Sequence, residues 1–432
     1  MKKLLTGVVV VVAGALLILP KVIGSRGAKA YDEAIRQQVA ATLPGAVVET
    51  EKLDEGWFSS EGRHHIRISE EVLSERMPHV PNDGPGTATD GEVDLIINSK
   101  IHHGPIAFSA LGSRGGSFLP LAAVSESTFE LKSGQDTVEI PGTLFSQVGL
   151  GGGSGKAIYV VDKFQKDIKG TLLGLHAVDI EFDIDDDGNA VKAQGEMGTL
   201  SLKGAKGDSV QFKDARIEAD MNKAHGLWFG TSGMDMEQLS ITGPQGQQFS
   251  FKDMSFRADV DGNDTAFTAA QVVKVSEVTG PDVALEDFVL EYTFENVDTQ
   301  AVLRIQKTNT EDPAAVPEAM LNEFKAIVER SPKFNINELS FKMPEGKVAA
   351  DLHFGLPEQV DMNAFPYSLM QQLQGNGTVR IAEGVMPRLE KLSSGMSAQL
   401  EQQGFLAKNG SDYVAELKLQ NGQFTVNDKP LR

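Results

Sequence analysis

The densest set of possible metal ligands is the stretch DIDDDGN, which begins at Asp183. Asp183, Asp185 and Asp187 match the first half of an EF-hand loop, in which alternating carboxylates surround a calcium ion. The twelfth position of such a loop should be a bidentate glutamate, and here it is Gln194. Because the flanks have strand-like patterns and related stretches carry turn residues at the same point, the sequence favours a hairpin turn, with a weak calcium site as the alternative.

Two other chemistries have little support in the sequence. GGGSGK at 151–156 resembles a phosphate-binding loop only in part, since Leu150 takes the place of the first glycine and Ala157 follows where Ser or Thr would bind magnesium. Ser59 and Ser60 have no sequence sign of an activating base, and the chain has no HExxH or G-x-S-x-G motif. We therefore predict no catalytic residues and no cofactor.

Histidines occur in two tandem pairs, His64–His65 and His102–His103. Adjacent residues on a strand point to opposite faces, so neither pair can hold one metal ion by itself. Members of the two pairs could meet across paired strands, but a third ligand would still be missing. These histidines are therefore interpreted as structural or surface residues.

The composition narrows the possible functions. Sixty acidic and forty basic residues leave a net charge of −20, which repels phosphate backbones and disfavours nucleic-acid binding. The absence of cysteine excludes disulfides and thiol catalysis. An enzyme would have to be a hydrolase that works through carboxylates. The oligomeric state stays open.

The elements that must position any site follow a repeated phrase. FKDARIEADM at 212–221 returns as FKDMSFRADV at 251–260, which is 39 residues later. Weaker copies at 177–184 and 285–294 extend the pattern to units of about 37 residues. Periods of this length predict one supersecondary unit that is stacked repeatedly.

Apolar and charged residues alternate within each unit, which predicts half-buried strands with one apolar face. The predicted fold is therefore α+β and strand-dominated: an extended antiparallel β meander built from ~37-residue repeats and packed with several helices. The apolar residues of successive units are expected to line up across neighbouring strands as a possible apolar groove: Val178, Ile180, Ile217, Phe256 and Tyr292.

Helical patterns at 316–332, 359–373 and 386–404 could cover this apolar face, with a hairpin between them around PEG at 344–346. Two alternatives remain. The helices fill the face, with Phe324 and Leu389 in contact with the row, or they leave an elongated apolar channel that binds a lipid, an acyl chain or a partner protein.

The N-terminus predicts export. Lys2 and Lys3 precede an uncharged run from Leu4 to Pro20, which spans roughly 25 Å as a helix. Counting on to Ile23 brings the length to about 30 Å, the thickness of a bilayer core. We expect residues 4–23 to anchor the chain in the inner membrane as a single transmembrane helix, with its bulk in the periplasm. The alternative is a cleaved signal with AKA at 28–30 as the cleavage site. The predicted regions are a membrane anchor or signal at 1–25, an α+β region at 26–150, a repetitive β region at 151–310 and a helix-and-hairpin region at 311–432.

Three phrases resemble the YdgA-like family of Gram-negative envelope proteins, a family of unknown function. They are EKLDEGWFSSEG at 51–62, KIHHGPIAF at 100–108 and ELKLQNGQFTVNDKPL at 416–431. The residues that carry the resemblance are Gly56, Trp57, Phe58, Ser60, His103, Gly104 and Pro105. The resemblance implies an exported protein associated with the inner membrane, and it brings no catalytic residues.

These observations predict a periplasmic, membrane-tethered binding or scaffold protein without enzymatic activity. The first alternative is a carrier that holds lipid or acyl chains along an apolar groove of the sheet. The second is a carboxylate-dependent periplasmic hydrolase.

Overall fold

Strands make up most of the described part of the protein. The computed structural model describes the residues 32, 35–36, 39–40, 45–56, 59–69, 92–103, 121–133, 136–149, 155–168, 171–185, 189–204, 206–307, 316–363, 365, 368–392 and 396–431. The predicted anchor at 1–25 lies outside them.

The chain divides into two compact units, Met1–Ala205 and Lys206–Arg432. The boundary lies inside the region that was predicted as repetitive. In the first unit, each strand pairs antiparallel with the next one along the chain. Its strands are β1 (Val47–Glu55), β2 (Ser59–Ser69), β3 (Glu92–His103), β4 (Leu121–Ser133), β5 (Asp136–Gly149), β6 (Gly155–Ile168), β7 (Thr171–Ile184) and β8 (Ala190–Lys203).

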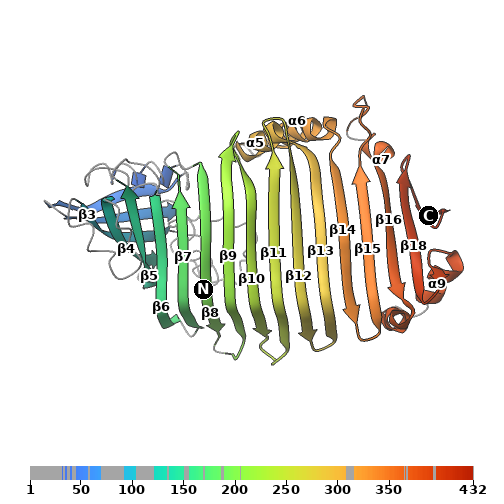
Figure 1. The fold of residues 1–432 in the computed structure, drawn as a ribbon, viewed down its shortest axis with the longest axis horizontal. Helices are drawn as coiled ribbons and strands as arrows, with labels where there is room; N and C mark the ends of the chain where they lie inside the picture. The colour runs from blue at the N-terminus through green and yellow to red at the C-terminus, as the bar shows by residue number, and fades with distance from the viewer. Residues whose placement is uncertain are drawn as a thin grey trace. The chain divides into compact units, whose positions relative to one another are not determined.

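The second unit continues the same topology from β9 to β16 (Figure 1). Next to β16 lies β18, which also pairs with β17 and β19, and β20 pairs with β19. The strands are β9 (Ser209–Ala224), β10 (Leu227–Thr242), β11 (Gln248–Gly262), β12 (Ala266–Gly280), β13 (Val283–Asp298), β14 (Lys333–Met343), β15 (Gly346–Gly355), β16 (Gln374–Ala382), β17 (Ala407–Asn409), β18 (Asp412–Gln420), β19 (Gln423–Val426) and β20 (Lys429–Pro430). The predicted strand-dominated antiparallel meander is confirmed, including the hairpin around PEG, where Met343 pairs with Gly346.

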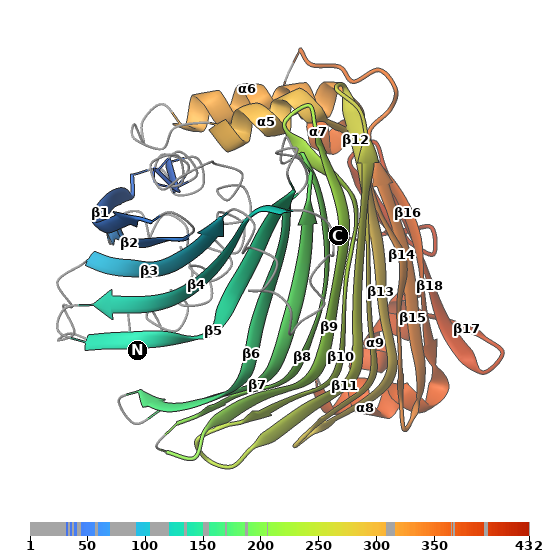
Figure 2. The same cartoon turned by 60° about the vertical axis from the view of Figure 1, so that its left-hand side comes forward.

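The described helices are few and short. They are α5 (Thr299–Lys307), α6 (Val316–Glu329), α7 (Leu369–Gln372), the 3-10 turn η1 (Glu383–Val385), α8 (Met386–Leu392) and α9 (Met396–Gln403). In the second unit, α5 and α6 lie at one end of the strands, whereas α8 and α9 lie at the other end (Figure 2). Not one of these described helices has the length and apolar character needed to span a membrane.

The first unit has a fully buried core on one face of its sheet. Alternate residues of β2, β3, β4 and β5 meet there, and the exposed fractions of Ile66, Ile97 and Leu144 are 0%. Ile35 and Val39, from the helical residues that precede β1, belong to the same cluster and are also 0% exposed. Helical residues therefore pack on the apolar face in this unit.

The strands of the second unit curve along their length (Figure 2). In β9, the alternation of buried and exposed side chains shifts by one residue at a single point. In β9 the apolar positions next to Asp214 that are half-buried or buried are Val210 and Phe212 before it and Ala215 and Ile217 after it, so their spacing changes from two to three around Asp214. Asp214 has a left-handed backbone with φ of 46°. A residue in this conformation turns the strand and re-aims the side chains that follow, as in a β-bulge.

The neighbouring strand slips at the same place. Met236 and Leu239 are the apolar positions on either side of the slip in β10. The pairs Met236–Ala215 and Gln238–Lys213 lie on either side of it with unchanged register. Because both strands slip together, the sheet bends without losing its strand pairing.

Candidate functional site

The aspartates of DIDDDGN lie at the hairpin between β7 and β8. The Asp185 carboxylate accepts hydrogen bonds from the backbone N–H groups of Asn189 at 2.6 Å and Ala190 at 2.9 Å. Asp183 is exposed and pairs in register with Lys192, while Asp187 lies outside the described residues. In the described part of the chain, no group of three or more acidic or histidine side chains is placed to hold a metal ion. Asp185 acts as a turn-forming residue there.

The residues behind the family resemblance have structural surroundings where they are described. Gly56 closes the turn into β2, where its N–H donates to the Ser59 carbonyl at 2.9 Å, and a Cβ at Gly56 would lie 2.5 Å from that oxygen. Ser60 is buried on β2. His103 ends β3, but its side chain is not described, and Trp57, Phe58, Gly104 and Pro105 lie outside the described residues.

A polar cluster joins the helical residues before β1 to the sheet of the first unit. His64 is 0% exposed, and its Nε2 lies 3.2 Å from Asp32 Oδ1. Arg36 donates to Asp32 Oδ2 at 3.0 Å and to the Val48 carbonyl at 2.6 Å, and Thr50 donates to Asp32. His65 points to the other face and meets Glu51 at 2.6 Å, as expected for adjacent strand residues.

The electrostatics of this cluster favour a neutral histidine beside a charged aspartate. Burial lowers the pKa of His64, although the charge of Asp32 opposes the shift. Burial by itself would raise the pKa of Asp32, but hydrogen bonds from Arg36 and Thr50 and the nearby positive charges lower it. Asp32 and Arg36 were not predicted as part of a cluster: their spacing of four permits an ion pair on one helical turn, but Thr50 and His64, which complete the cluster, lie at least 14 residues away. The contacts in this cluster hold a helix on the sheet.

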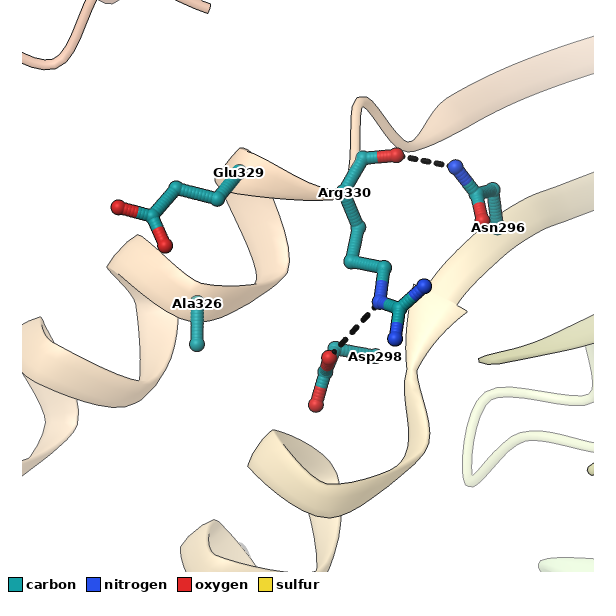
Figure 3. A pocket seen from close by; sticks show the side chains of 5 residues that line it. All are labelled: Asn296, Asp298, Ala326, Glu329 and Arg330. Atoms are coloured by element: carbon teal, nitrogen blue, oxygen red, sulfur yellow. Dashed lines mark hydrogen bonds and ion pairs between the residues drawn. The ribbon is translucent and has the colours of Figure 1, made fainter. Parts of the chain in front are cut away.

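A pocket of about 360 Å³ lies beside α6, lined by Asn296, Asp298, Ala326, Glu329 and Arg330 (Figure 3). Arg330 Nε donates to Asp298 Oδ2 at 3.0 Å, and Asn296 donates to the Arg330 carbonyl. The Glu329 carboxylate points away from the Arg330 side chain (Figure 3).

The polar groups of this pocket connect structural elements. Asp298 Oδ1 accepts the N–H of Ala301 at 2.7 Å and so caps the start of α5, while its other oxygen binds Arg330 after α6. No second carboxylate converges on Asp298 among these lining residues. The polar contacts of this pocket therefore stabilise the packing of α5 and α6 against the end of β13.

The largest candidate surface is one face of the second unit. Three adjacent rows of mainly apolar side chains cross seven paired strands, from β9 to β15, and we call these residues the apolar face. The first row is Ile217, Met234, Phe256, Val273, Leu290, Leu339 and Ala350; the second is Ala219, Ser232, Ala258, Gln271, Tyr292, Ile336 and Leu352; the third is Met221, Gly230, Val260, Ala269, Phe294, Phe334 and Phe354.

The apolar face is half-exposed. None of its residues is buried in the way that Ile66 or Ile97 is buried in the first unit, and Phe294 is 43% exposed. The strand pairing is the same in both units, so strand pairing does not explain the difference. What differs is the covering layer: helical residues contribute Ile35 and Val39 to the first core, whereas α5 and α6 lie at one end of the strands of the second unit (Figure 2).

Beyond β15, residues of α8 and α9 cover the sheet at β16 and β18. Met386, Leu400 and Leu406 pack against Val379 and Ala415, which continue the first row onto β16 and β18. Phe324 of α6 is 48% exposed and meets Phe365, with ring centroids 6.2 Å apart.

The expected row of groove residues is partly brought together. Ile217 and Phe256 lie in one row, because both pair with Met234. Tyr292 lies in the next row, opposite Gln271. Val178 and Ile180 belong to the first unit, where Val178 is in the core and Ile180 packs against it. Gln271 was missed, although it interrupts the apolar pattern of FTAAQVVKV and so carried a signal.

With this geometry in place, the chain was compared with known proteins. A family described as "Bacterial protein of unknown function (DUF945)" matches residues 1–432. The chain belongs to the DUF945 family. No curated protein and no solved structure matches it. Membership of DUF945 makes this a bacterial chain and assigns no role to a residue.

Proposed function

We propose that the protein is a non-enzymatic binding protein of the bacterial envelope, which holds elongated apolar ligands of the acyl-chain type against the apolar face. The observation that carries the proposal is the half-exposure of three apolar rows over seven consecutive strands. Exposed apolar patches of this extent are uncommon on soluble proteins and usually mark binding surfaces.

The dimensions fit such a ligand. Seven strands spaced by ~4.8 Å span about 29 Å across the sheet. The acyl chains of one leaflet extend over about 15 Å, half of a bilayer core. A chain lying across the strands would therefore be in contact with the apolar face along its whole length. Each methylene removed from water contributes about 0.8 kcal/mol.

The charge of the protein restricts the ligand. The net charge of −20 disfavours ligands with an anionic headgroup. On the opposite face, Arg257 lies 2.6 Å from Asp235, so charged residues are paired with each other on that side. Neutral or zwitterionic acyl compounds are the better match.

The location and the construction of the face complete the proposal. Lys2, Lys3 and the apolar run at 4–23 support an inner-membrane anchor with the bulk of the chain in the periplasm. The resemblance to the YdgA-like family supports the same location. The phrases repeated at 212–221 and 251–260 support a sheet built from units of about 37 residues, each of which adds strands to the apolar face.

A pair of adjacent substitutions tests the function. Val273 belongs to the apolar face, whereas its neighbour Lys274 is exposed on the other face of β12. The full chain is purified in detergent, and binding of the fluorescent apolar probe N-phenyl-1-naphthylamine is measured after detergent removal. Val273→Glu should weaken binding at least tenfold, and Lys274→Glu should leave it unchanged. Native mass spectrometry should also find acyl lipid on the wild-type protein.

The outcomes distinguish the alternatives. Equal binding by both variants would reject the apolar face as the ligand site. A retained protein in place of a lipid in the mass spectra would favour the scaffold function, in which the same face binds a partner chain. Thermal unfolding of both variants controls for loss of structure.

A further inference from the structure

A polar pair interrupts the apolar face. Gln271 on β12 and Tyr292 on β13 are direct cross-strand neighbours, and the Tyr292 hydroxyl donates a hydrogen bond to Oε1 of Gln271. Both side chains are half-buried in the second row of the face. Removing polar groups from water has a cost, so a polar pair in an otherwise apolar ligand surface usually fixes the orientation of the ligand.

The hydrogen bond orients the amide group of Gln271. Because Tyr292 donates to Oε1, the two N–H groups on Nε2 remain as donors. Among the described residues, no acceptor is bound to Nε2. The pair therefore offers N–H donors at the surface of the face, and the natural partner of such donors is a carbonyl oxygen.

The neighbours of the pair define where an apolar chain would lie. On one side, the Tyr292 ring packs against Phe294 and Phe334, with centroid distances of 5.9 and 6.3 Å. On the other side, the row continues through Ala258, Ser232 and Ala219, whose side chains are short. From Gln271 to Ala219 the row crosses three strand spacings, or about 14 Å, which is close to the length of a leaflet's acyl chain.

We infer that Gln271, oriented by Tyr292, binds the carbonyl group of an uncharged acyl ester or amide whose chain extends along the second row toward Ala219. This inference rests on the proposed function and adds the class of ligand and its orientation. The Phe294 and Phe334 rings lie beside the carbonyl end, and the short side chains lie beneath the methylenes.

The test compares two ligands of similar length, methyl palmitate and hexadecane, which differ in the ester group. Each is delivered from cyclodextrin and displaces N-phenyl-1-naphthylamine from the full-length protein. A neutral hydrogen bond contributes about 1 kcal/mol, so the wild type should bind methyl palmitate about fivefold more tightly than hexadecane. Gln271→Leu should abolish this preference and leave hexadecane binding unchanged.

Two further variants locate the effect. Tyr292→Phe keeps the ring but frees the amide, so part of the preference should be lost. Ser232→Ala removes a hydroxyl about 10 Å away, two strands along the same row, so it should affect the binding of both ligands alike and leave the preference for the ester unchanged. Matching thermal unfolding curves confirm that the variants fold.

The possible results separate the two proposals. If Gln271→Leu weakens the binding of both ligands equally, or changes the binding of neither, the carbonyl subsite is rejected while the apolar face remains a binding surface. If Ser232→Ala abolishes the preference instead, the subsite lies elsewhere and the inference fails. If the wild type binds neither ligand, the proposed function is rejected together with the inference.

Discussion

Asp214 on β9 and Asp253 on β11 take the same left-handed backbone conformation, with φ of 46° and 45°, although they lie 39 residues apart. Each ends the repeated triplet FKD. The lysine before each aspartate forms an ion pair with a glutamate of the next strand, Lys213 with Glu237 and Lys252 with Glu277. Aspartate is one of the few side chains that tolerate this backbone conformation. The repeated triplet therefore supplies an aspartate at the two positions where the backbone is left-handed and the strand turns.

Replacing Asp214 tests this explanation. Asp214→Val should lower the free energy of unfolding by about 1–2 kcal/mol, because a β-branched residue is strained in the left-handed region. Asp214→Gly should change it by no more than about 0.5 kcal/mol, since glycine adopts that conformation freely. Urea unfolding of the two variants measures the difference. Equal losses would mean that the aspartate side chain matters more than the backbone conformation.

The strands themselves could be predicted from the sequence because a half-buried strand alternates with period two. The slip at Asp214 could not, since a single change of spacing looks like an imperfection in the pattern. The placement of Tyr292 failed for a related reason. Register depends on the turn lengths and irregularities between strands, and one step of two residues moves Tyr292 from the row of Phe256 to the next row.

Whether the apolar face is covered or exposed also could not be predicted from the sequence. Alternation indicates that one face is apolar, but it carries no information about which element packs there. The cover in the first unit comes from Ile35 and Val39, far from most of the strands that they cover. In the second unit, α5 and α6 lie at one end of the strands, although their sequences are amphipathic in the expected way (Figure 2).

The same charged substitution in the two units should have different costs. Ile66 is fully buried, so Ile66→Asp should destabilise the first unit by about 3–5 kcal/mol. Ile217 is half-exposed, so Ile217→Asp should cost only about 1–2 kcal/mol. Hydrogen exchange in β2 and β9 reports each unit separately. Glu218→Lys on the opposite face is the control and should change little; equal costs for Ile66→Asp and Ile217→Asp would mean that the apolar face is covered in solution.

The stability of the first unit should depend on pH through His64. Its pKa is lowered in the folded protein by burial, so below the usual pKa of about 6.5 the unfolded chain binds a proton more readily than the folded one. Stability should therefore fall as the pH is lowered from 7.5 to 5.5. Because the pKa of Asp32 is also lowered, a further loss should follow below about pH 4.

His64→Gln keeps a polar side chain beside Asp32 and removes the titration. Hydrogen-exchange protection of β2, corrected for intrinsic rates, should then lose its dependence on pH between 7.5 and 5.5. His225→Gln, at an exposed turn of the second unit, should leave that dependence as it is in the wild type. An unchanged pH profile in His64→Gln would assign the effect to another group.

The proposed location is tested by fusing alkaline phosphatase after Arg432. The enzyme is active only in the periplasm, so the fusion should be active if the run at 4–23 exports the chain. Deleting residues 1–25 from the same fusion should abolish the activity. Activity in the cytoplasmic fraction alone would reject the envelope location.

Because the left-handed aspartates of β9 and β11 lie at the same level on either side of β10, one more hairpin of 39 residues could join the sheet without disturbing the register of its neighbours. Each strand contacts mainly the strands beside it, so such an addition needs no new core. It would widen the apolar face by two strand spacings, about 10 Å. Under the proposed function, a single internal duplication would change how much ligand the apolar face accommodates, so that capacity is adjusted in steps of two strands.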